Sequence, residues 1–175
     1  MEKRFELTEN YVVNEFGTKL YQIKCIKTFK YAKKGELGGF IEKEENLSQK
    51  GNAWVYDNAH VYGDARVYDN ALVYARVCDN AQVYGNARVF NNALVSGNAL
   101  VSGNALVYDN AHVYGAARVY GAARVCDNAR VYGSAKVYDD VLVSGNARVY
   151  GNVWVYGNAK VCDDALVHGD TKVCK

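Results

Sequence analysis

Three histidines, His60, His112 and His168, are the side chains best suited to proton transfer near neutral pH. Each occupies a position of a short repeat that elsewhere holds residues as varied as Arg, Leu, Ser and Tyr. These repeat positions therefore accept many kinds of polar side chain, and this explains the presence of the three histidines more simply than a catalytic role does. No loop longer than a standard corner interrupts residues 79–174, so we expect no water-excluding substrate pocket and no catalytic residue.

Metal and cofactor chemistry is not indicated either. The five cysteines lack the Cys-x-x-Cys spacing of zinc sites, and Cys78, Cys126 and Cys162 replace Tyr at one repeat position, so we expect free thiols. The repeat aspartates lie at corners and lack the Gly-Gly-x-Gly-x-Asp pattern of calcium-binding repeats. Glycines recur every six residues, so their likeness to phosphate-binding loops is uninformative. We predict no metal site and no cofactor.

Charge and hydropathy narrow the partner classes. The 21 basic and 19 acidic residues give a net charge of +2, which produces no large single-sign field and argues against nucleic-acid binding. No apolar run approaches the roughly 18 residues of a membrane span, and the N-terminal residues contain no apolar signal core. We therefore expect no membrane partner and a cytoplasmic location.

The dominant feature is a six-residue repeat that runs from Gly51 to Cys174. It comprises 21 units, of which 20 have six residues and one, residues 75–78, has four. The fifth position is Val in every unit and the third is Ala in 18 units. The first position is almost always Gly or Asp, and the second is usually Asn. A fixed short period of this kind predicts a solenoid in which each repeat packs on its neighbours.

Alternation within the unit predicts which side chains point inward. Ala-x-Val-Tyr is a four-residue strand whose first and third side chains share one face, and only that face is uniformly small and apolar. Gly/Asp-Asn then turns the corner, because these residues tolerate the left-handed backbone conformation. Six residues suit one side of a three-sided coil, so parallel stacking at about 4.8 Å per layer gives about seven triangular coils.

The segment Val83–Arg88, Val-Tyr-Gly-Asn-Ala-Arg, resembles the hexapeptide-repeat pattern. That superfamily folds as a left-handed parallel β-helix, so the resemblance implies an all-β fold of this handedness. The chain departs from the family in placing Tyr after Val. Many relatives are trimeric acyltransferases that use an outward histidine as general base, so an acyltransferase-like enzyme using His60 or His112 is one functional alternative. The loop that interrupts the coils of such enzymes is missing here.

Residues 1–50 lack the repeat and are predicted to form a small β-rich capping module for the β-helix of residues 51–175. Residues 11–13 and 20–26 look like strands joined near Gly17. The leader Gly-Gly-Phe-Ile-Glu…Asn-Leu-Ser, followed by Gly-Asn-Ala-Trp-Val-Tyr, resembles small proteins of phages and prophages. This resemblance implies a phage-encoded protein that acts in the host cytoplasm on a bacterial factor, such as a defence protein.

Outward residues 18 positions apart should form three columns from Asp79 onward. The Tyr120 column is Tyr84, Ser102, Tyr120, Tyr138, Tyr156 and Cys174; the Tyr132 column is Ser96, Tyr114, Tyr132, Tyr150 and His168; the Tyr108 column is Phe90, Tyr108, Cys126, Ser144 and Cys162. Tyr and Arg are enriched at binding hot spots. We therefore predict a binding surface made of Tyr114, Arg118, Tyr120, Arg130, Tyr132, Tyr138, Arg148, Tyr150, Trp154 and Tyr156. The alternative is a tyrosine ladder that only supports its neighbours.

The leading hypothesis is a non-catalytic binding protein that self-associates. Leu106 and Leu142 flank the Tyr108 column, the least aromatic one, and are the predicted interface of a homo-oligomer, for which the relatives suggest a trimer. A third functional class is a sponge for a small anionic nucleotide, with bases stacked on Tyr and phosphates on Arg in grooves between subunits.

The four-residue unit, residues 75–78, lacks its two corner residues. A deletion of two preserves the in–out alternation, so Ala71, Val73, Ala75 and Val77 can all stay inside. The corner is either tightened or replaced by a straight overrun, and we expect a local distortion there.

Overall fold

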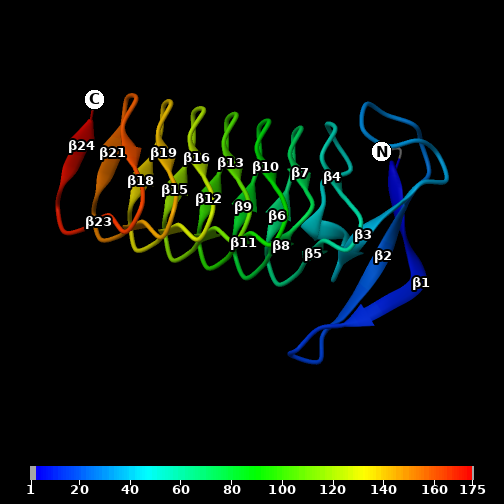
Figure 1. Cartoon of the computed structure of the whole chain (residues 1–175). Helices are drawn as coiled ribbons and strands as arrows, with labels where there is room; N and C mark the ends of the chain where they lie inside the picture. The colour runs from blue at the N-terminus through cyan, green and yellow to red at the C-terminus, as the bar shows by residue number, and fades with distance from the viewer. Residues whose placement is uncertain (1–2, 175) are drawn as a thin grey trace.

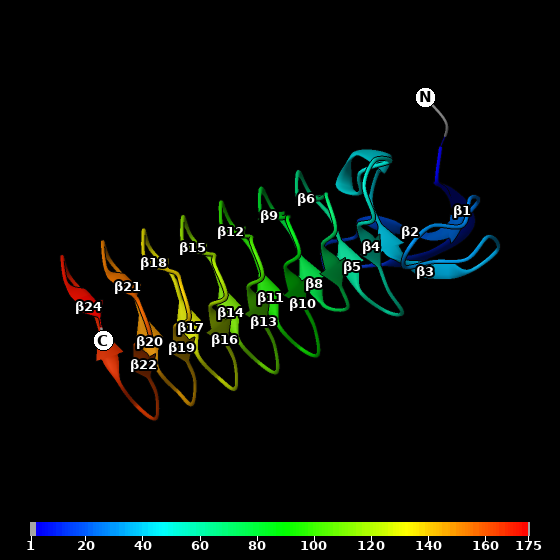
Figure 2. The same cartoon turned by 90° about the horizontal axis from the view of Figure 1, so that it is seen from above.

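The computed structural model describes residues 3–174, so Met1, Glu2 and Lys175, at the ends of the two predicted segments, lie outside the described residues. Three sheets form the sides of a solenoid whose coils stack along one axis (Figures 1 and 2). The predicted all-β parallel solenoid is confirmed, with about eight turns. The one helical element of the described chain is a three-residue 3-10 turn, η1 (Glu44–Asn46). The left-handed sense of the coil stays a prediction.

Each sheet takes one short strand from every coil. The first sheet contains β5 (His60–Val61), β8 (Arg76–Val77), β11 (Leu94–Val95), β14 (His112–Val113), β17 (Arg130–Val131), β20 (Arg148–Val149) and β23 (Leu166–Val167). The second contains β4 (Trp54–Val55), β7 (Leu72–Val73), β10 (Arg88–Val89), β13 (Leu106–Val107), β16 (Arg124–Val125), β19 (Leu142–Val143) and β22 (Lys160–Val161). The third contains β6 (Arg66–Val67), β9 (Gln82–Val83), β12 (Leu100–Val101), β15 (Arg118–Val119), β18 (Lys136–Val137), β21 (Trp154–Tyr156) and β24 (Lys172–Cys174).

Neighbouring strands pair in parallel and in register. Leu94 lies beside His112, and His112 lies beside Arg130, each 18 residues further along the chain. The same register holds in the other two sheets from β9 and β10 onward. The three predicted columns are therefore confirmed.

The interior is filled by the Ala and Val side chains of the repeat. Those of coils two to six are almost fully buried; Ala117, Val119 and Val137, for example, have no exposed surface. Ala and Val suit this core because opposing sheets of a narrow coil leave no room for larger side chains. The predicted inward face is confirmed.

The first corner residue has a positive φ in all 20 full units, which explains its restriction to Gly, Asp and Asn. Where corners stack most closely, only Gly fits without adjustment. A Cβ on Gly121, whose φ is 71°, would lie 2.7 Å from the backbone nitrogen of Asp139 in the next coil.

The N-terminal segment forms an antiparallel three-stranded unit that continues into the solenoid. Strands β1 (Phe5–Val13), β2 (Lys19–Cys25) and β3 (Leu37–Ile41) extend the first sheet, because β3 pairs in parallel with β5. Leu47 bridges Val67 of the third sheet. Residues 37–50, which the sequence analysis places in the capping module, thus form part of a first coil. In Figure 1 this segment closes the N-terminal end of the solenoid.

Aromatic and glycine residues seal this end. Trp54 is fully buried, with its ring 6.4 Å from that of Phe5 and 5.5 Å from that of Phe29. Gly38 and Gly39 allow β3 to lie close to the backbone of residues 55–59, since a Cβ on Gly38 would lie 2.6 Å from the Val55 carbonyl oxygen. The module therefore covers the apolar end of the coil stack. No helix within residues 3–174 is long and apolar enough to cross a membrane.

The short unit is accommodated by a tightened corner between the second and first sheets. His60 pairs with Arg76, 16 residues further on, whereas the next coil restores the spacing of 18 by pairing Arg76 with Leu94. The strands on both sides keep their places, because the Tyr74 N–H still donates to the Val89 carbonyl (2.8 Å) and the His60 N–H to the Ala75 carbonyl (3.2 Å). The straight overrun is excluded.

Two tryptophans at the same repeat position provide a test of the capping role. Trp54→Ala should lower the free energy of unfolding by about 3–5 kcal/mol, because it opens a cavity between the module and the first coil. Trp154→Ala, at a site that is 38% exposed, should cost well under half of that. Chemical denaturation monitored by circular dichroism measures both, and equal losses would contradict the packing of Trp54 as the seal.

Candidate functional site

The Tyr132 column forms a continuous aromatic ladder on the first sheet. The ring centroids of Tyr114 and Tyr132 are 4.8 Å apart with planes 3° from parallel, and Tyr132 and Tyr150 repeat this at 4.8 Å and 6°. His168 extends the stack at 5.3 Å from Tyr150. The in-register strands set this spacing, so the backbone fixes where each ring lies.

Arginines stand beside this ladder. Arg130 and Arg148 are exposed and occupy neighbouring rungs of β17 and β20. Within residues 3–174 neither forms an ion pair, and the Asp residues of the repeat lie at the corners. Burial raises the pKa of Tyr114, and the charge of Tyr132 adds to this, so the hydroxyl remains a neutral donor at physiological pH. The face offers hydroxyls, ring edges and unpaired guanidinium groups together.

The Tyr120 column is a second ladder, on the third sheet. Tyr120 and Tyr138 stack at 4.9 Å, and Tyr138 and Tyr156 at 5.5 Å. Beside them, the Trp154 ring lies between two lysines, with the Lys136 Nζ 4.3 Å and the Lys172 Nζ 5.3 Å from its centroid. The predicted surface is therefore divided between two sheets. The residues beside the Tyr120 column, which include Arg118, lie around a corner from those beside the Tyr132 column.

The predicted interface leucines lie on the second sheet and do not touch each other. Leu106 and Leu142 are half-buried and both pair with Arg124, which is exposed between them. The second sheet therefore presents single leucines separated by an arginine, which is not a continuous apolar stripe.

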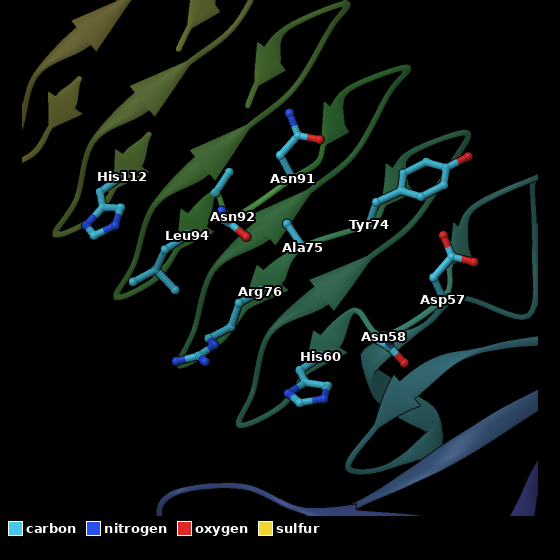
Figure 3. A pocket seen from close by; sticks show the side chains of 11 residues that line it. Asp57, Asn58, His60, Tyr74, Ala75, Arg76, Asn91, Asn92, Leu94 and His112 are labelled. Carbon is cyan, nitrogen blue, oxygen red and sulfur yellow. The ribbon is translucent and has the colours of Figure 1, made fainter. Parts of the chain in front are cut away.

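His60 and His112 lie in one row on the first sheet, separated by Arg76 and Leu94 (Figure 3). Burial lowers the pKa of both imidazoles, and the neighbouring charges of Arg76 and Arg130 lower them further. Among the described residues, no side chain forms a hydrogen bond with either ring, so no carboxylate orients an imidazole as catalytic histidines require. His168 lies at the far end of the Tyr132 column.

Both histidines border a hollow of about 620 Å³ at the tightened corner. Figure 3 shows the corner Asp57–Asn58 on one side, the corner Asn91–Asn92 on the other, and Tyr74 and Ala75 between them. Arg76 lies at the rim, where its Nη1 donates to Glu15 Oε1 at 2.9 Å and so ties the hairpin of β1 and β2 to the solenoid. The hollow is not among the features predicted from the sequence, although the missing corner pair signals it.

Within residues 3–174, no group of three His, Cys, Asp or Glu side chains is placed to hold a metal ion. The corner aspartates instead accept backbone hydrogen bonds. Asp79 and Asp127, for example, each accept the N–H of the glycine 18 residues later, both at 2.8 Å.

The repeats match a known family model. They match the YdcK beta solenoid repeat at residues 81–97, 93–108, 99–115, 123–139 and 143–157. These segments lie in the regular part of the solenoid, and together with the three parallel sheets they agree with a hexapeptide-repeat-like β-solenoid. A search of the curated proteins gave no match to the chain.

The environment of His112 can be tested by NMR titration. Its pKa should lie below the ordinary value of about 6.5, and Arg130→Gln should raise it without restoring that value, because burial is the larger cause. Arg148→Gln, one rung further on, should leave it unchanged. A folded-state pKa below the unfolded one also means that stability present above about pH 6.5 is lost as the pH falls. An unshifted pKa in the wild-type protein would contradict this environment.

Proposed function

We propose that this chain is a non-catalytic binding protein that engages a protein partner through the Tyr132 face, defined as Tyr114, Tyr132, Tyr150, Arg130 and Arg148. The observation that carries the proposal is the pairing of a preorganised tyrosine stack with arginines that have no acidic partner in the described chain. Tyr and Arg contribute most often to binding hot spots, and side chains already held in place lose little conformational entropy on binding.

The chemistry of the face indicates its partner. Guanidinium groups separated by one strand spacing favour a surface that carries carboxylates, which they bind in a bidentate manner. Tyrosine hydroxyls and ring edges suit backbone carbonyls and apolar side chains. The resemblance of the leader to phage proteins makes a bacterial host protein, such as a defence factor, the first partner to test, with the host cytoplasm as the place of action.

The two other functional classes have less support. Rings stacked at 4.8 Å cover each other's faces, so a nucleotide base would find a free face only at the end of a stack or in a groove between subunits. An acyltransferase using His60 or His112 lacks a residue that would orient the imidazole within the described chain.

Two matched face variants test the proposal. Replacing Tyr114, Tyr132 and Tyr150 with Ser and Arg130 and Arg148 with Gln should abolish partner capture from a bacterial lysate while the solenoid stays folded. The control variant replaces Tyr120, Tyr138 and Tyr156 with Ser and Arg118 with Gln on the third sheet, and should keep binding. A truncated hot-spot aromatic typically costs about 2 kcal/mol or more in binding, so three together should exceed a thousandfold loss in affinity.

The two outcomes that contradict the proposal are distinct. If both variants retain capture and every biological effect, the tyrosine ladders are structural. If the control variant alone loses binding, the function lies on the third sheet. Loss of activity on His60→Ala or His112→Ala alone would instead support the enzyme alternative.

Self-association through the second sheet is a separate proposal. We expect a homo-oligomer at tens of micromolar, and Leu106→Ser with Leu142→Ser should shift it toward the monomer, because these leucines are the apolar side chains that alternate with arginines there. Light scattering coupled to size-exclusion chromatography measures the mass. A wild-type monomer at this concentration would rule the interface out.

A further inference from the structure

A ladder of side-chain amides runs along the corner that joins the second sheet to the first. In this corner ladder each Asn donates an Nδ2 hydrogen bond to the Oδ1 of the residue 18 positions later. The rungs are Asn92 to Asn110 at 3.2 Å, Asn110 to Asn128 at 3.3 Å, Asn128 to Asn146 at 3.2 Å and Asn146 to Asp164 at 3.0 Å. The donor direction is the same at every rung.

The tightened corner removes one rung of this ladder. Asn58 holds this corner position in the coil before the short unit. The coil of the short unit passes from Tyr74 directly to Ala75 and supplies no asparagine, and the ladder begins again at Asn92 one coil later. Two strand spacings, roughly 9.6 Å, separate the corners that the missing rung would have joined. Among the described residues the Asn58 side chain forms no hydrogen bond, and Asn92 Oδ1 accepts none.

Backbone groups at the gap also lack hydrogen-bond partners within the described residues. In most full corners the second residue donates its N–H to the first residue of the next corner, as from Asn110 to the Asp127 carbonyl at 2.8 Å; within the described residues Asp64 and Asn92 are exceptions. Within residues 3–174, the Asn58 N–H finds no such acceptor and the Asn91 carbonyl no such donor. In the part of the chain that the structure describes, Asp57 also accepts no backbone N–H of the kind that Asp127, in the same column, accepts at 2.8 Å. The hollow is therefore bordered by unpaired donors of Asn58 and unpaired acceptors of Asn91 and Asn92 within the described residues.

The Asn91–Asn92 side of the gap is preorganised. The Asn92 amide is oriented by its bond to Asn110, which directs its Oδ1 toward the gap, and Asn91 is fixed by a 2.8 Å bond from its Nδ2 to Asp109 Oδ1. Figure 3 shows the two corners around the shared hollow, with Ala75 between them. A side that is already held in place reduces the entropic cost of binding, and the volume of about 620 Å³ lies within the range of small-molecule sites.

We propose that this gap binds the carboxamide of an asparagine, either the free amino acid or an asparagine side chain on a turn of a peptide. The ligand carbonyl accepts from Asn58 Nδ2, and its NH₂ group donates to Asn92 Oδ1, which restores the missing rung with the donor direction of the ladder. The nearby amine or backbone N–H of the ligand donates to the Asp57 carboxylate. An aspartate of the same shape is rejected, because its oxygen cannot donate to Asn92 and its charge faces Asp57.

The binding test is a ¹H–¹⁵N NMR titration of the full chain with L-asparagine, with a capped Gly-Asn dipeptide and with L-aspartate. The first two should shift the side-chain amide signals of Asn58 and Asn92 with millimolar affinity, and L-aspartate should bind at least tenfold more weakly. Binding of the amino acid alone identifies the free metabolite as the source, and binding of the dipeptide alone identifies a peptide turn. No saturable shift with either, or equal binding of L-aspartate, overturns the proposal.

Matched variants locate the site. Asn58→Ala and Asn92→Ala should each weaken binding at least tenfold, whereas Asn128→Ala, two rungs beyond Asn92 in the same ladder, should not change it. Insertion of Gly-Asn between Tyr74 and Ala75 completes the short unit, so it should fill the gap, abolish binding and raise the melting temperature. Undiminished binding to the insertion variant overturns the assignment, and so does undiminished binding to both Asn58→Ala and Asn92→Ala. Because either result is sufficient, the test still works if one of these three variants folds poorly. None of these changes touches the Tyr132 face.

Discussion

The in-register parallel hydrogen bonding of successive coils is the constraint on which the rest of this structure depends. Each coil donates backbone N–H groups to carbonyl groups of the next coil at equivalent positions, such as Tyr114 N–H to the Val131 carbonyl and Tyr132 N–H to the Val149 carbonyl. These bonds hold only if every coil has the same path. The interior must then accept the same small side chains at each level, which is why Ala and Val recur and why larger residues appear only where the N-terminal module closes the end.

The same register places equivalent surface residues of successive coils next to one another. A tyrosine placed at the outward position of one unit lies one strand spacing from the next, so the outer face becomes a ladder of rings, and the corners become ladders of amides. Such ladders stabilise the coil by contacts between like residues. They also create long surfaces of fixed chemistry, which suits binding better than catalysis, because catalysis needs different groups converging on one point.

The sequence predicted most of the solenoid because period and alternation are both strict from Gly51 onward. The inward Ala and Val, the positive-φ corners and the three columns follow from that pattern alone. The first coil escaped prediction because residues 37–50 contribute to it without the period: Gly38 and Gly39 are there for close approach, and Leu47 pairs through a single bridge. Whether the tyrosine surface binds a partner could not be derived, since a self-supporting ladder and a binding face require the same residues.

The hollow at residues 74–76 shows why a break in a repeat carries more information than the repeat. A deletion of one residue would reverse the in–out alternation and place Val77 on the surface. The loss of two leaves Ala75 and Val77 buried, so the core tolerates it and only the corner changes. In a regular coil most corner backbone groups pair with the corner of the next coil. At residues 74–76 the whole corner pair is missing from the repeat, and the groups that would have paired with it are left to interact with something outside the repeat.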